Sequence, residues 1–164
     1  MIGVYRDKLD SCKKELENIN SIIKKEPLSD SVKYLTSYAV VLATGCIELV
    51  FKEMLFDAVS AGCSDEAKCF LNNQIIESSC NPTVKKINDY LSKMGTDCKK
   101  SFSLIEKSND ASRLQSLVNL RNSFALGYQI SASISDVIEY FVSGSIILSN
   151  LERILFNKKE TNEL

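Results

Sequence analysis

Apolar residues recur every three or four positions along most of the chain, which is the spacing of one face of an α-helix. The clearest case is the segment from Gly3 to Lys25, whose apolar stripe consists of Leu9, Cys12, Leu16, Ile19 and Ile23. No stretch of useful length alternates apolar and polar residues, and no segment repeats. The pattern therefore predicts an all-α fold, a helical bundle of about five to seven helices.

Proline, glycine and capping residues mark the expected helix boundaries. Pro27 ends the first helix, and Ser29 or Asp30 caps a long second helix that reaches about Ala61. The later helices are expected to run from Ser64 to about Ile76, from Asn81-Pro82 to Met94, from about Ala111 to near Gly127, and onward from Ser135-Asp136. Residues 96–110 are expected to form a loop that contains a short helix around Phe102–Glu106.

The longest apolar stretch, from Tyr38 to Phe56, is interrupted by Glu48, Lys52 and Glu53. These charges favour a buried helix of a soluble protein over a membrane span. The stretch is apolar on too many sides for one partner helix. We therefore expect it to pack against at least two neighbours.

The chain has 164 residues, of which 45% are hydrophobic and 25% charged, with a net charge of −1. These values predict one domain, residues 1–157, followed by a polar C-terminal tail, residues 158–164. The six cysteines form no C-x-x-C pair, and the chain contains no histidine, so we expect no metal and no cofactor. Since we identify no signal peptide, we expect free thiols and a cytoplasmic location.

Arg121 stands where the helical pattern calls for an apolar residue. Leu117 and Val118 lie one turn before it on the same face, and Phe124 and Ala125 lie one turn after it. A guanidinium on such a face keeps its charge and needs an anionic side chain, a subunit interface or a phosphate. Alternatively, the stem of the arginine covers apolar surface while its head reaches water.

The segment from Arg121 to Tyr128, called the Arg-Asn motif below, reads R-N-S-F-A-L-G-Y. It resembles the signature of HEPN domains, which is R-N-x-x-x-H in many members and R-x-x-x-x-H-x-Y in some toxin members. Arg121, Asn122 and Tyr128 match, whereas Leu126 occupies the position of the motif histidine. The run from Tyr34 to Ala43, followed by Glu48, is similar to the long early helix of prokaryotic HEPN proteins, especially the RiboL-PSP-associated group.

This resemblance implies a HEPN-like bundle that forms a homodimer and cleaves RNA without a metal, at a site composed of two motif helices. Arg121 would bind the phosphate and stabilise its developing charge, and Asn122 would orient a reacting group. Leu126 cannot transfer a proton, so this chain is expected to be inactive or nearly so. Leu126 is either an engineered substitution that silences a toxic RNase or a natural residue of a protein that has abandoned cleavage.

Two further residues are candidates for the site. Glu48 could pair with the motif arginine as a supporting residue, or form an i,i+4 ion pair with Lys52. Tyr128 could hydrogen-bond a phosphate, serve as a modification site for an antitoxin, or simply cap the end of a helix.

The sequence thus favours a HEPN-type metal-independent endoribonuclease of a toxin–antitoxin or antiphage defence system, with an inactivated active site. Its expected partners are a second copy of the chain, an RNA substrate, and an antitoxin or other defence component, but no membrane. The alternative is a non-enzymatic helical module for dimerisation, RNA binding or protein binding, so the sequence leaves open whether this chain is an enzyme. A nucleotide-binding regulatory domain ranks lower because the chain lacks a Gly-rich phosphate loop.

Overall fold

A computed structural model describes residues 1–156, and all regular secondary structure in this range is α-helical. The helices are α1 (Gly3–Lys25), α2 (Ser31–Ser60), α3 (Asp65–Ile75), α4 (Val84–Met94), α5 (Thr96–Glu106), α6 (Asn109–Ala125) and α7 (Ile134–Phe156). The expected all-α bundle is therefore confirmed, while the predicted tail, residues 158–164, lies outside the described residues. In residues 1–156, no helix is long and apolar enough to cross a membrane.

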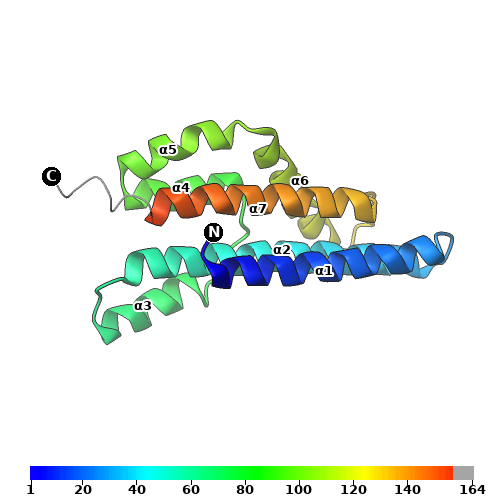
Figure 1. The fold of residues 1–164 in the computed structure, drawn as a ribbon, viewed down its shortest axis with the longest axis horizontal. Helices are drawn as coiled ribbons and strands as arrows, with labels where there is room; N and C mark the ends of the chain where they lie inside the picture. Colours follow the sequence, from blue (N-terminus) through cyan, green and yellow to red (C-terminus); the bar gives the residue numbers. More distant parts are fainter. Residues whose placement is uncertain (157–164) are drawn as a thin grey trace.

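Two long antiparallel helices, α1 and α2, form one layer of the molecule (Figure 1). The C-terminal helix α7 runs along this pair and contacts α1, α2, α5 and α6. Helix α5 lies on the side of α7 away from α1 and α2, with α4 packed against α5, and α3 projects from the C-terminal end of α2 (Figure 1). The positively charged N-terminus pairs with the buried Glu152 of α7, which ties the start of the chain to its last helix.

The α1 stripe predicted from the sequence is buried throughout, from Leu9 to Ile23. Helix α2 contacts α1, α3, α6 and α7, which confirms that its apolar surface needs more than one partner. Because α2 contacts both α6 and α7, the core runs through the middle of the bundle rather than between two helices.

Gly144 of α7 leaves no room for a side chain between α2 and α6. A Cβ atom built there would lie 3.0 Å from Ile47 Cδ1 of α2 and 3.3 Å from Leu114 Cδ1 of α6. The absence of a side chain at Gly144 thus allows α7 to pack on α2 and α6 at the same point.

Two expected helix boundaries were wrong. Helix α4 begins at Val84 rather than at Pro82, because the Thr83 side chain accepts a hydrogen bond from Lys86 N and caps the helix there. Residues 96–106 form a complete helix, α5, instead of a loop with one short turn. Its two buried residues, Cys98 and Phe102, are one turn apart, and this contact with the core stabilises a segment that is otherwise polar.

The other helix starts follow the expected chemistry with small shifts. Ser64 caps α3 by accepting a hydrogen bond from Ala67 N. Helix α7 begins at Ile134, where the Ser133 and Asp136 side chains bond each other's backbone N–H groups, so Asp136 lies inside the first turn. Asp30 precedes α2 without a side-chain cap, and Ser29 Oγ accepts from Ser31 N instead.

We expect Gly144→Val to lower the free energy of unfolding by about 1–3 kcal/mol, because the added carbons overlap Ile47 and Leu114. The matched test adds Ile47→Ala, which removes the Ile47 atoms that overlap and conserves total side-chain volume. Urea denaturation should then show a loss in the double variant that is smaller than the sum of the two single losses. Strictly additive losses would contradict the assigned contact.

Candidate functional site

The Arg-Asn motif occupies the last turn of α6 and the residues that follow it. Leu117 and Val118 are fully buried, Arg121 and Asn122 are half-buried, and Phe124 and Ala125 are exposed. The apolar face on which we expected Arg121 is therefore buried before Arg121 and exposed to solvent after it. Among the described residues, no carboxylate lies within ion-pair distance of the Arg121 guanidinium.

A Schellman motif terminates α6 and sets the conformation of the residues after Arg121. Tyr128 N donates to Ser123 O at 3.0 Å, and Gly127 N donates to Phe124 O at 2.9 Å. Gly127 adopts φ +84°, in the left-handed region that favours glycine. Leu126 is consequently the C-cap residue, and its side chain is 75% exposed.

Asn122 connects the motif to the segment between α3 and α4. Its Oδ1 accepts a hydrogen bond from Asn81 Nδ2 at 3.1 Å and a longer one from Arg121 Nη1 at 3.4 Å. The asparagine thus holds the guanidinium beside residue 81. Asn81 was missed as a site residue because the sequence only marked Asn81-Pro82 as a helix start. Since 41 residues separate the two asparagines, no local pattern signals their contact.

Glu48 forms the expected i,i+4 ion pair with Lys52 of α2, at 2.7 Å, rather than an ion pair with Arg121. The same carboxylate oxygen accepts a hydrogen bond from Cys80 N at 3.1 Å, and Lys52 Nζ donates to Ile76 O at 3.2 Å. These bonds anchor the α3–α4 connection to α2. Because Asn81 follows Cys80 directly, Glu48 supports the segment that contacts Asn122.

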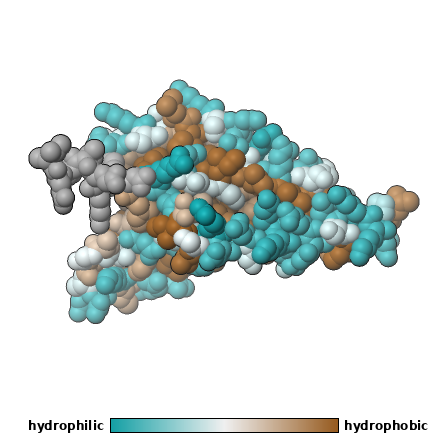
Figure 2. All heavy atoms as spheres, in the orientation of Figure 1, coloured by the Kyte–Doolittle hydropathy of each residue, from teal (hydrophilic) through white to brown (hydrophobic). Residues whose placement is uncertain are grey.

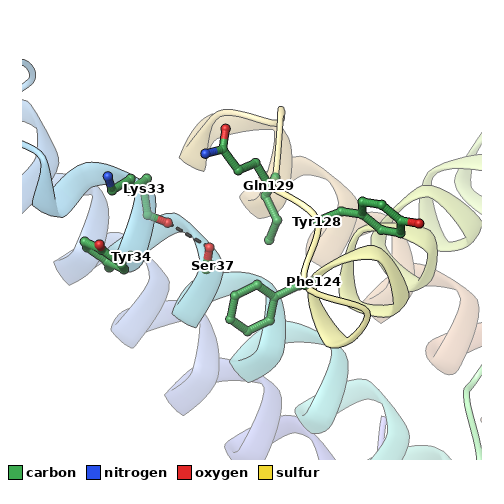
Figure 3. Close-up of a pocket in the computed structure, with 8 residues that line it drawn as sticks. Lys33, Tyr34, Ser37, Phe124, Tyr128 and Gln129 are labelled. Atoms are coloured by element: carbon green, nitrogen blue, oxygen red, sulfur yellow. Dashed lines mark hydrogen bonds between the residues drawn. The ribbon is translucent and has the colours of Figure 1, made fainter.

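A pocket of about 280 Å³ lies between the N-terminal part of α2 and the end of α6. It is lined by Lys33, Tyr34, Ser37, Phe124, Gly127, Tyr128, Gln129 and Ile130. The Phe124 ring points across the pocket toward Ser37, whereas the Tyr128 ring points away from α2 (Figure 3). The pocket thus joins three residues of the motif to a wall on α2 that the sequence did not identify.

The α2 wall of this pocket carries a cation and an exposed ring. Lys33 Nζ lies over the Tyr34 ring, 5.1 Å from its centroid, and Ser37 Oγ donates to Lys33 O at 2.8 Å (Figure 3). Exposed rings beside a lysine suit a flat, electron-rich or anionic ligand. The motif itself offers a guanidinium and an amide, which suit a phosphate. In residues 1–156, no group of three or more cysteine or acidic residues could hold a metal ion.

Comparison with known proteins bears on the same residues. The RiboL-PSP-HEPN family model matches residues 7–157 of the chain, a range that includes all seven helices almost entirely and the whole Arg-Asn motif. The chain belongs to the RiboL-PSP-HEPN family. Neither the curated proteins nor the solved structures give a significant match. The family assignment agrees with the all-α bundle expected for a HEPN domain.

In this HEPN domain, Gly127 and its left-handed backbone conformation should contribute to the stability of the fold. We expect Gly127→Ala to lower the free energy of unfolding by roughly 1–2 kcal/mol, because a Cβ disfavours φ +84° even though open space surrounds it. Gly127→Asn is the matched control, since asparagine tolerates this conformation better. Guanidinium denaturation followed by circular dichroism would contradict the Schellman assignment if both variants lost equal stability.

Proposed function

We propose that this chain is a HEPN-type, metal-independent endoribonuclease, a toxin or phage-defence effector, whose cleavage is silenced by Leu126. The observation that carries the proposal is Arg121: a half-buried guanidinium, held by Asn122, with no carboxylate partner in residues 1–156. An arginine in such a place is suited to bind a phosphate from outside the chain.

The proposed reaction needs a proton-transfer group as well as a phosphate ligand. The ribose 2′-oxygen loses its proton and attacks the adjacent phosphorus, and the 5′-oxygen leaves with a proton, so that a 2′,3′-cyclic phosphate remains. Arg121 would neutralise the charge that develops on the phosphoryl oxygens. A histidine suits both proton transfers near neutral pH, but this chain has Leu126 at that position and contains no histidine.

The surroundings of Leu126 are compatible with the missing histidine. The leucine side chain is mostly in solvent, so no packing within the described chain requires it. The adjoining pocket, with Tyr34, Phe124 and Lys33, supports RNA as the ligand because exposed rings stack on unpaired bases. Tyr128, which ends the Schellman motif with its ring exposed, is available to a phosphate or to a modifying antitoxin.

A composite site requires a dimer, and we assign its interface to the outer face of α2. Exposed apolar residues follow one another on that face at helical spacing: Tyr34, Tyr38, Val41 and Leu49. Gly45 lies among them, and nothing stands within 4 Å of where its Cβ would be, so a second helix could approach closely. Tyr34 also lines the pocket with Phe124, which makes this face continuous with the motif.

The second candidate function is a non-enzymatic module that binds RNA or protein. A specific observation favours it: Leu126, Phe124 and Tyr128 are all large and exposed. Such a cluster suits a protein contact, for instance with an antitoxin, at least as well as it suits catalysis. The two functions differ in whether restoring one histidine restores cleavage.

We expect the Leu126→His variant to cleave cytoplasmic single-stranded RNA without added metal, at a rate about 10²–10⁴-fold above that of the unsubstituted protein. Adding Arg121→Ala should abolish that gain, because the phosphate charge would be uncompensated. The measurement is gel analysis of labelled RNA with mapping of cyclic-phosphate ends. Asn119→Ala in the same background is a control, since Asn119 is exposed on α6 one half-turn from Arg121.

If a folded, dimeric Leu126→His protein leaves a panel of RNAs intact, the nuclease proposal is wrong and the binding module replaces it. Cleavage that survives Arg121→Ala would instead indicate a contaminating RNase.

We expect the protein to be a dimer at micromolar concentration and Val41→Glu to convert it to a monomer. The substitution would place two carboxylates near the twofold axis of the α2 interface. Val142→Glu is the matched control, because Val41 and Val142 are mid-helix valines that are 44% and 38% exposed. Val142 belongs to α7, along which Figure 2 shows an apolar band beside the hydrophilic surface of α1.

Light scattering decides between the two faces. Dissociation by Val142→Glu alone would assign the dimer to α7, and a monomeric unsubstituted protein would remove the composite site.

A further inference from the structure

Cys12 of α1 and Cys46 of α2 face each other across the antiparallel helix pair. Cys12 Sγ contacts Leu42 O of α2 at 3.9 Å, and Cys46 Sγ contacts Lys8 O of α1 at 3.7 Å. Each sulfur therefore lies against the carbonyl one turn before the other cysteine. This reciprocal geometry places two sulfur atoms together in the hydrophobic contact between α1 and α2.

The two thiols differ in environment. Cys12 is buried, while Cys46 is partly open to solvent. The neighbouring Cys12 thiol lowers the pKa of Cys46, and the nearby Lys8 ammonium acts in the same direction, against burial and Glu53. The Cys46 thiol and burial raise the pKa of Cys12. A partly accessible sulfur with a lowered pKa beside a buried thiol is the arrangement of redox-sensing cysteine pairs.

The remaining cysteines lack this arrangement. Cys63 Sγ contacts Val59 O near the end of α2, Cys69 is exposed, Cys98 is buried in α5, and the pKa of Cys80 is raised by burial. Among the described residues, Cys12 and Cys46 are thus the pair whose sulfurs are poised to react with each other.

We propose that Cys12 and Cys46 form a peroxide-sensitive dithiol that closes to a reversible disulfide between α1 and α2. In the first step the Cys46 sulfur attacks an oxygen of a hydroperoxide. The O–O bond breaks, the sulfur becomes a sulfenic acid, and water leaves when hydrogen peroxide is the oxidant. In the second step the Cys12 sulfur attacks the sulfenic sulfur, the S–OH bond breaks, and a second water carries away the thiol proton. A dithiol reductant reverses the change by thiol–disulfide exchange.

The disulfide would join the middles of α1 and α2 and close a loop that contains the whole turn between them. Cross-linking two distant points reduces the conformational entropy of the unfolded chain, and the folded state is stabilised relative to it. The bond lies away from the Arg-Asn motif, so the proposal does not depend on RNA cleavage.

The test treats the purified, reduced protein with a small molar excess of hydrogen peroxide and blocks the remaining thiols. We expect the intact mass before blocking to fall by about 2 Da, and peptide mapping without reductant to recover Cys12 linked to Cys46. The midpoint of thermal unfolding should rise by on the order of 10 °C and return after dithiothreitol. Each of the variants Cys12→Ser and Cys46→Ser should abolish both changes.

Cys63→Ser is the matched control, because Cys63 is half-buried like Cys46 but its Sγ contacts Val59 O, four residues earlier in the chain. This variant should still form the bond and gain the same thermal shift. The proposal is overturned if mapping of the unsubstituted protein finds Cys12 and Cys46 unlinked while other cysteines are oxidised. A Cys12–Cys46 bond that dithiothreitol does not reduce would also overturn it.

Discussion

The packing of α7 against both α2 and α6 is the contact on which the position of the Arg-Asn motif depends. Gly144 allows the three helices to meet, because a Cβ there would lie within 3.3 Å of both Ile47 of α2 and Leu114 of α6. Once α6 is held there, its buried residues Leu117 and Val118 leave Arg121 at the edge of the core. A small residue in the last helix thereby allows the close packing of α6, the helix that carries Arg121.

Much of the fold follows from the sequence because helical periodicity is a local signal. The α1 stripe and the apolar length of α2 are each carried by several turns of regularly spaced residues, so single exceptions do not obscure them. The full length of helix α5 was not predicted, because only two residues, Cys98 and Phe102, mark its buried side. The start of α4 was misjudged because the Thr83 hydroxyl outweighed the preference of proline for a first helical turn.

In the candidate site, too, the residues that are neighbours in the sequence were predicted, and those brought together by tertiary packing were not. Arg121, Asn122, Leu126 and Tyr128 are contiguous in the sequence, so their pattern alone predicts a shared place. Asn81 and the α2 wall of the pocket contribute through tertiary packing, and nothing near them in the sequence indicates their neighbours. Glu48 illustrates the limit of a residue-type argument. Its negative charge made an ion pair with Arg121 reasonable. The Glu48 carboxylate instead pairs with Lys52, one turn away, and accepts a hydrogen bond from Cys80 N.

Helix α2 connects these features, since its different faces contact α1 at Cys46, the α3–α4 connection at Glu48 and the pocket at Ser37. Helix α2 contains no proline, and the helix continues without a break on both sides of its one glycine, Gly45. We therefore expect α2 to move as a rigid unit. In the proposed dimer the outer face of α2 would meet its own copy. A cross-link to α1 would then restrain the same helix whose N-terminal part lines the pocket.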